Sequence, residues 1–137
     1  MFQCDREIEW GECDAMGIVF YPSFFKWMDA TFHAFTRSEG FDQSSLKNDY
    51  GLAGTPLVEA GCQFLRPGRY YDRLVVELTI TKVSRSSFSL AYGFTIGDTP
   101  IARGNETRAF VAEKDGTIGK ADLPEAIRKT LEKHHAG

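Results

Sequence analysis

The feature that most limits how this chain can fold is a two-residue alternation of apolar side chains, which recurs between residues 57 and 114. It is clearest over residues 87–96, where apolar side chains stand at every second position: Phe88, Leu90, Tyr92, Phe94 and Ile96. Because successive side chains of a β-strand point to opposite faces, this spacing predicts a strand with one buried face. The same pattern predicts strands over residues 57–67, 72–84 and 100–114, and a first strand over residues 2–10.

Three of the other predicted strands also have an apolar face. These faces comprise Cys4, Ile8 and Trp10 in the first strand, then Val58, Ala60, Cys62 and Phe64, and then Leu74, Val76, Leu78 and Ile80. Short turn sequences separate the later strands, such as GDTP at residues 97–100, and the last strand is expected to end at the DG of residues 115–116. Turns this short favour antiparallel neighbours.

A long helix is predicted from Pro22 to about Gly40, because proline suits a first helical turn and glycine suits a helix end. Its apolar side chains fall on one stripe: Phe24, Trp27, Met28, Thr31 and Phe35. The opposite stripe is polar and carries Lys26, Asp29, His33 and Arg37. Residues 41–56 are turn-rich with room for a short helical piece, and residues 123–135 form a second, C-terminal helix.

These elements together predict an α+β fold in which an antiparallel sheet wraps around one long helix, plus a short C-terminal helix. A helix that is aromatic along one side needs an apolar surface to cover it, and the inner face of the sheet provides one. The length of 137 residues favours one domain, residues 1–137, over two.

The composition limits the classes of partner that the protein is expected to bind. The formal net charge is −3 and no lysine- and arginine-rich block occurs, so we expect no nucleic acid and no acidic membrane surface. No signal-like start or membrane-spanning apolar stretch is present, and the three cysteines have no framework spacing, which indicates a cytoplasmic protein. Three histidines, His33, His134 and His135, do not make a metal site in this arrangement.

A lone acid, Asp14, stands in the short segment ECDAMG, ahead of the long helix. It is either a turn-forming acid or the chemical centre of the protein. Its neighbour Glu12 is expected to be solvated, and Cys13 has no nearby histidine to activate a thiol. His33 lies four residues after Asp29, which suits a pair on the helix surface better than a catalytic base.

The run ECDAMGIVFYPSFFKWMDA, residues 12–30, resembles the first motif of hotdog-fold acyl-CoA thioesterases, and of the 4-hydroxybenzoyl-CoA thioesterase type in particular. The segments GTP at residues 54–56 and FLRPGRYYDRLVVE at residues 64–77 are also similar to that group. The related thioesterases of the Tol–Pal operon usually carry histidine where this chain has Tyr21. The resemblance extends over residues 6–131 and implies a hotdog fold, with a five-stranded antiparallel sheet and an active site at a subunit interface.

The resemblance places the family's catalytic aspartate at Asp14 and its helix N-terminus at Tyr21 and Pro22. A carboxylate can attack a thioester as a nucleophile or activate water as a general base, and both roles stay open for Asp14. The Tyr21 N–H, at the positive end of the helix, is the expected donor to the oxyanion, since Pro22 has no N–H. Gly17 lets the backbone turn between the acid and the helix. The expected chemistry requires no metal or other cofactor, and coenzyme A is part of the substrate.

Several further residues are expected to bind the substrate. Trp10, Phe20 and Tyr21 would shape an acyl pocket, and Glu59 would either line that pocket across the interface or point outward to solvent. Coenzyme A phosphates need cations, and the candidates are Arg85 with Ser86 and Ser87, although the 4-hydroxybenzoyl-CoA type has a more basic run there; Arg66, Arg69 and Arg103 are alternatives.

The predicted function is therefore hydrolysis of an acyl-CoA by a homo-oligomer, either a dimer or a tetramer. An aromatic acyl group follows from the resemblance, and a short aliphatic one is the alternative. A hotdog module that binds acyl-CoA without turnover is the second hypothesis.

Overall fold

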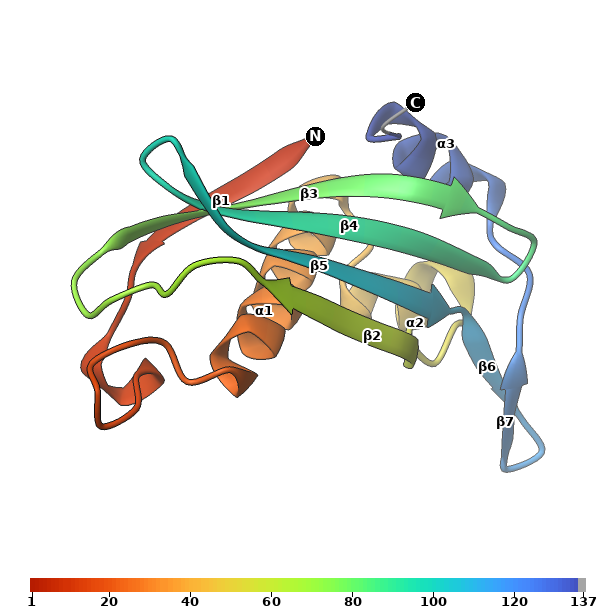
Figure 1. Cartoon of the computed structure of the whole chain (residues 1–137). Helices are drawn as coiled ribbons and strands as arrows, with labels where there is room; N and C mark the ends of the chain where they lie inside the picture. The colour runs from red at the N-terminus through yellow and green to blue at the C-terminus, as the bar shows by residue number, and fades with distance from the viewer. Residues whose placement is uncertain (136–137) are drawn as a thin grey trace.

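The computed structural model describes residues 1–135, and one antiparallel sheet dominates it (Figure 1). The five strands of this sheet lie in the order β1-β3-β4-β5-β2. Their bounds are β1 Phe2–Glu7, β2 Leu57–Phe64, β3 Arg73–Val83, β4 Ser87–Ile96 and β5 Thr99–Ala109. The helices are the 3-10 turn η1 Trp10–Glu12, α1 Pro22–Glu39, α2 Gln43–Tyr50 and α3 Glu125–Lys133. A small hairpin, β6 Val111–Lys114 and β7 Thr117–Lys120, extends from the end of β5.

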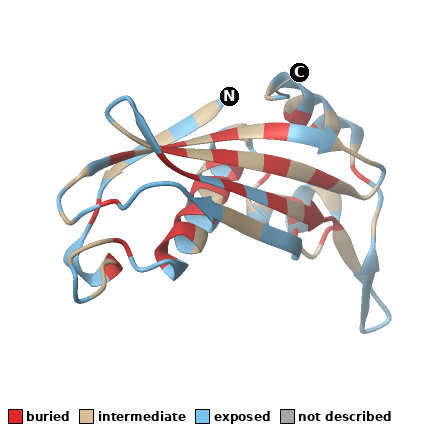
Figure 2. Ribbon diagram, viewed as in Figure 1, coloured by how far each residue is buried: buried red, intermediate tan, exposed pale blue. Residues whose placement is uncertain are grey.

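Helix α1 packs across the inner face of the sheet, as predicted (Figures 1 and 2). All five residues of the predicted stripe are buried, and Phe32 joins them. The helix approaches β5 closely at Gly104, where an added Cβ would overlap the Met28 sulfur. The prediction of a five-stranded antiparallel sheet wrapped around one long helix, the hotdog arrangement, is confirmed.

The predicted faces of the central strands are also correct. Leu74, Val76, Leu78 and Ile80 of β3 are buried, as are the first four apolar residues of the β4 alternation. The predicted face of β2 is different, because Val58 and Phe64 are exposed. Among residues 1–135, β2 pairs only with β5, so its other edge and part of its inner face are left open.

Two local predictions were wrong, and one strand was not predicted. Trp10 does not share a strand face with Cys4 and Ile8, because β1 ends at Glu7 and Trp10 begins a 3-10 turn with its side chain exposed. The predicted strand over residues 100–114 is broken at Phe110, which is fully buried. The segment after the DG turn was not predicted as a strand, but it returns as β7.

A buried ionic cluster lies between α1, β4 and β5. The Glu106 carboxylate accepts hydrogen bonds from the Tyr92 hydroxyl at 2.7 Å and from Arg108 Nε at 3.0 Å. Arg108 also donates to Asp29 at 3.0 Å and to the Thr55 carbonyl at 3.2 Å. Burial and the neighbouring Glu106 carboxylate raise the pKa of the Tyr92 hydroxyl well above its ordinary value. This cluster therefore crosslinks the helix to the sheet, from the buried Glu106 and Arg108 to the half-exposed Asp29.

Candidate active site

Asp14 lies in a tight loop that its own backbone closes. Its N–H donates to the Ile18 carbonyl at 2.8 Å, and its carbonyl accepts from the Gly17 N–H at 2.9 Å. Gly17 has φ +77°, a left-handed conformation that glycine adopts without strain. The side-chain Oδ1 accepts from the Met16 N–H at 2.8 Å, while Oδ2 has no hydrogen-bond partner within residues 1–135. One oxygen therefore fixes the carboxylate in a turn, and the other can act on a ligand.

Helix α1 begins just after this loop, and its first N–H groups are nearly all used. Ser23 N–H donates to the Phe20 carbonyl at 2.9 Å, and Phe24 N–H donates to the Tyr21 carbonyl at 3.2 Å. Pro22 has no N–H to donate. The Tyr21 N–H has no partner in the described part of the chain, so it is the free donor at the positive end of the helix.

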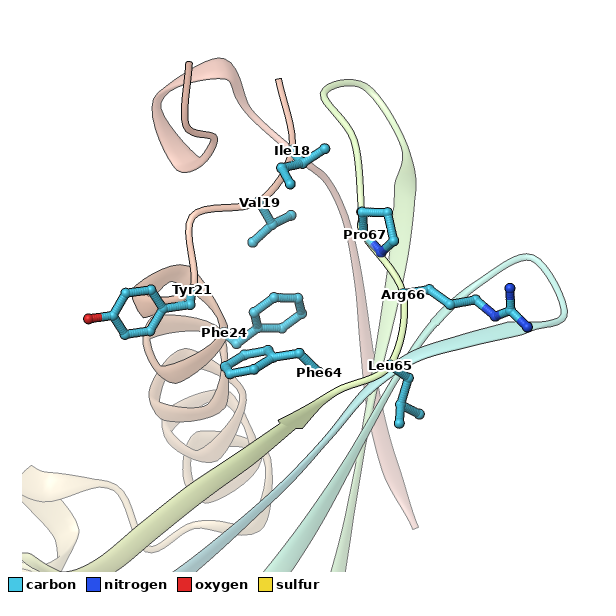
Figure 3. Close-up of a pocket in the computed structure, with 9 residues that line it drawn as sticks. Ile18, Val19, Tyr21, Phe24, Phe64, Leu65, Arg66 and Pro67 are labelled. Atoms are coloured by element: carbon cyan, nitrogen blue, oxygen red, sulfur yellow. The ribbon is translucent and has the colours of Figure 1, made fainter. Parts of the chain in front are cut away.

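A pocket of about 300 Å³ opens beside Tyr21 (Figure 3). The loop before α1, the first turn of α1 and the segment after β2 line it, through Ile18, Val19, Tyr21, Phe24, Phe64, Leu65, Arg66, Pro67 and Gly68. The Phe24 and Phe64 rings, whose centres lie 5.4 Å apart, form part of its wall. Asp14 does not line the pocket, but it is hydrogen-bonded to the backbone of Ile18, which does.

Gly68 joins the two walls of this pocket. Its carbonyl accepts from the Val19 N–H at 2.9 Å, and an added Cβ would lie 3.1–3.2 Å from Ile101, Ile8 and Val19 side chains. At these separations an added methyl group would press on all three side chains, and the hydrogen bond from Val19 joins the loop that carries the acid to the loop after β2.

The other predicted pocket residues are placed differently. Phe20 is half-exposed and meets Tyr21 edge-on at 5.4 Å, beside the pocket. Trp10 packs on Tyr70 at 5.2 Å and does not line the pocket. Arg66 lines it, although in Figure 3 its guanidinium points away from the aromatic rings. Arg69 pairs through its backbone with Ile18, next to the same pocket.

Arg85, Ser86 and Ser87 lie at the far end of the sheet from the acid. Arg85 and Ser86 lie in the turn between β3 and β4 and Ser87 begins β4, on the right in Figure 1, whereas the loop of Asp14 is on the left. The Arg85 guanidinium pairs with the Asp122 carboxylate at 3.1 Å. Glu59 is exposed on β2, opposite Thr107 of β5, and Arg103 is exposed on β5. One chain therefore brings together Asp14, Gly17, Phe20 and Tyr21, but not these residues.

Glu12 is not solvated as we expected. Its side chain is 5% exposed, and it accepts hydrogen bonds from Arg6 at 3.0 Å, the Glu9 N–H at 2.9 Å and the Trp27 indole at 2.7 Å. In the sequence, a glutamate beside a glycine and a cysteine gives no sign of burial. The signal was Trp27, whose indole N–H needs an acceptor when the ring lies in the core.

Thiol and imidazole chemistry receive no support from the geometry. Burial raises the pKa of the Cys13 thiol, with further increases from the Asp14 and Glu12 charges, so this thiol is protonated at neutral pH. His33 Nε2 lies 3.4 Å from Asp29 Oδ1, the helix-surface pair that the spacing predicted. Within residues 1–135, no group of three or more histidine, cysteine or acidic side chains could hold a metal ion.

Comparison with known proteins decides the family. Residues 16–102, well over half of the chain, match the family described as the thioesterase superfamily. The chain belongs to this superfamily. It is therefore an enzyme of the thioesterase class, and the predicted resemblance is confirmed.

Named relatives of this thioesterase are similar over nearly their whole length. The chain is 32% identical to a 4-hydroxybenzoyl-CoA thioesterase of Pseudomonas sp. strain CBS-3, covering 87% of this chain and 89% of that protein. It is 26% identical to a 1,4-dihydroxy-2-naphthoyl-CoA hydrolase of Synechococcus elongatus, covering 96% and 95%. A solved gentisyl-coenzyme A thioesterase superposes with a TM-score of 0.81 at 32% identity, covering 96% and 99%.

None of the helices described for this thioesterase is both long enough and apolar enough to cross a membrane.

Proposed function

We propose that this thioesterase hydrolyses an acyl-CoA to the carboxylate and free coenzyme A. The observation that carries the proposal is that Asp14, with its free Oδ2, and the free Tyr21 N–H stand on one short segment that also lines a pocket of about 300 Å³. Asp14 Oδ2 either attacks the thioester carbonyl, expelling the thiolate and leaving an anhydride that water hydrolyses, or takes a proton from an attacking water. The Tyr21 N–H stabilises the negative charge on the carbonyl oxygen.

An aromatic acyl group is the proposed substrate class. The rings of Tyr21, Phe24 and Phe64 form much of the pocket wall, and flat rings pack well against such a surface. The named relatives act on 4-hydroxybenzoyl-CoA and 1,4-dihydroxy-2-naphthoyl-CoA, and the solved one is named for gentisyl-CoA. These acyl groups are all hydroxylated aromatic rings. A short aliphatic acyl group is the alternative, and it would fill the same pocket less completely.

We further propose a homodimer, with a tetramer as the larger alternative, that completes the site. The open edge of β2 leaves backbone groups unpaired beside the exposed side chains of Leu57, Val58 and Phe64. An antiparallel pairing of two β2 strands would bring the Phe64 end of one subunit beside the Leu57 end of the other.

That pairing would also unite the predicted substrate contacts. The Leu57 end of β2 lies opposite Arg108, which in turn lies opposite Phe88 near the β3–β4 turn. A partner's Glu59, Arg85, Ser86 and Ser87 would therefore face the end of the sheet that carries Asp14. This arrangement supports a nucleotide site built by the second subunit, with Arg85 as the phosphate ligand and no metal or further cofactor. We place the enzyme in the cytoplasm, in accord with three unpaired cysteines.

The test is release of free thiol from a panel of aromatic and short aliphatic acyl-CoAs. Hydroxybenzoyl-type esters should be cleaved fastest, and Asp14→Asn, which preserves shape, should lose at least about 90% of kcat/KM, or roughly 1.4 kcal/mol of transition-state stabilisation. A variant that keeps more than about a tenth of the activity would exclude Asp14 as the attacking or proton-accepting group. Binding of acyl-CoA without thiol release from any ester would favour the non-catalytic module instead.

A further inference from the structure

The residue that joins both ends of the acid loop is Glu12. Its backbone carbonyl accepts from the Phe20 N–H at 2.9 Å and from the Ser23 hydroxyl at 2.9 Å. Phe20 is the last loop residue before Tyr21, and Ser23 lies in the first turn of α1. Because Asp14 is only two residues after Glu12, one backbone oxygen sets the distance from the acid to the start of the helix.

The side chain of the same residue fixes this junction in the core. One carboxylate oxygen accepts from the Trp27 indole at 2.7 Å and from Arg6 at 3.0 Å, and the other accepts from the Glu9 N–H at 2.9 Å. These donors belong to α1, β1 and the turn before η1, so the carboxylate connects three elements. The Arg6 guanidinium also lies 5.6 Å from the centre of the Trp27 ring.

The charge on Glu12 is needed for this arrangement. Its two oxygens face three donors, and neither oxygen faces an acceptor. Within residues 1–135, Glu12 is the carboxylate that pairs with Arg6, through Nη2 at 3.0 Å, while the buried Arg6 Nε has no hydrogen-bond partner there. A glutamine of the same shape would place its NH₂ group against one of these donors, so it would break at least one bond without opening a cavity.

We infer that Glu12 is a positioning residue for the proposed hydrolysis, holding Asp14 and the Tyr21 N–H at the separation that the reacting carbonyl requires. It touches no substrate and acts through the loop and the helix start. The inference rests on the proposed function, since a fixed separation matters only if both groups act on one carbonyl. A small displacement of the reacting groups lowers the rate of the chemical step more than it weakens substrate binding.

The experiment compares Glu12→Gln with Ile127→Val. This control is a conservative substitution of a buried residue of α3, remote from the acid loop, and it removes one methylene group from the core. We expect Glu12→Gln to lower kcat about 10- to 100-fold while KM changes by less than about threefold. Ile127→Val should keep wild-type kcat even if its melting temperature falls as far as that of Glu12→Gln. A kcat for Glu12→Gln within about twofold of wild type, or an equal loss in the control, would overturn the inference.

A second substitution tests the route through the indole. Trp27→Phe removes the indole N–H, one of the donors that a glutamine NH₂ could oppose, while keeping an aromatic ring. The double variant Glu12→Gln with Trp27→Phe should therefore lose less kcat than the product of the two single losses. Strictly multiplicative losses would show that Glu12 does not act through Trp27 and would overturn this part of the inference.

Hydrogen exchange separates this inference from the proposed function. The amides of Asp14, Gly17 and Phe20 are hydrogen-bonded within the loop, and they should exchange faster in Glu12→Gln than in Ile127→Val. If the wild-type protein hydrolyses no thioester but these amides lose protection, the proposed function fails and Glu12 still positions the loop. If protection is unchanged, the inference about Glu12 fails whatever the activity.

Discussion

Arg108 offers the sharpest test of how this fold is held together. It lies on β5 with 3% of its surface exposed, and it donates to the Glu106 and Asp29 carboxylates and to the Thr55 carbonyl. Arg108→Met keeps most of the side-chain length and removes every one of these donors. Asp29 is half-exposed and can be hydrated instead, but Glu106, at 2% exposed, keeps only the Tyr92 hydroxyl.

The expected loss of stability follows from the Glu106 charge, which stays in the core when Arg108 is replaced. Removing one partner of a buried ion pair typically costs about 3–5 kcal/mol, because the remaining charge stays in the core without compensation. We therefore expect Arg108→Met to destabilise the protein by about 4 kcal/mol, equivalent to roughly 10–15 °C in melting temperature for a chain of this size. Replacing both members, as in Glu106→Leu with Arg108→Met, removes the stranded charge and should recover most of that loss.

The assay is urea unfolding followed by circular dichroism, at one fixed protein concentration because the proposed dimer couples stability to concentration. The single variant should shift the midpoint far to lower urea, and the double variant should lie close to wild type. A single-variant loss below about 1 kcal/mol, or a double variant no more stable than the single one, would refute the idea that an uncompensated Glu106 charge determines the cost.

Four further outcomes are expected. Gly104→Ala should cost about 1–3 kcal/mol in urea unfolding because its Cβ overlaps the Met28 sulfur, and a smaller residue at position 28 should restore stability. The pKa of Tyr92 is raised on folding, so its contribution to stability is complete below about pH 10 and falls as the pH rises further; Tyr92→Phe should flatten that decline. Burial raises the pKa of Cys62 to about 11, so Cys62 should react slowly with iodoacetamide at pH 8, and unfolding should abolish this protection. Arg85→Ala should raise KM for acyl-CoA and leave KM for a thioester without the nucleotide unchanged; equal KM changes for both would exclude a phosphate contact.

Periodicity was enough to predict the core. The apolar stripe of α1 and the alternating residues of β3 and β4 are buried because each element has one face that only the other can cover. The edge strand β2 also has an alternating pattern, but alternation does not reveal a strand's place in the sheet, so the exposure of Val58 and Phe64 was missed.

The candidate site was predictable only in part. The resemblance and the glycine after the acid indicated the loop of Asp14, and the proline indicated the helix start. The burial of Glu12 depends on Arg6 and Trp27, which lie on different elements and meet only when β1 and α1 pack together. The position of Trp10 depends on where β1 stops, and strand ends are set by tertiary contacts that alternation does not encode.

The strand order has a consequence for how the chain folds. Strand β2 is bonded only to β5 among the described strands, and β1 is bonded only to β3, so both edges pair residues that are far apart in sequence. Such non-local pairing makes folding slow, on the order of milliseconds to seconds. During synthesis, β2 has no strand to join until β5, which ends at residue 109, has emerged. The part of α1 that packs on β2 and β5, at Phe24 and Met28, stays uncovered until the same event. A nascent chain that stalls before β5 therefore exposes a β-strand and an apolar helix together, which makes it a substrate for chaperones or a source of aggregates.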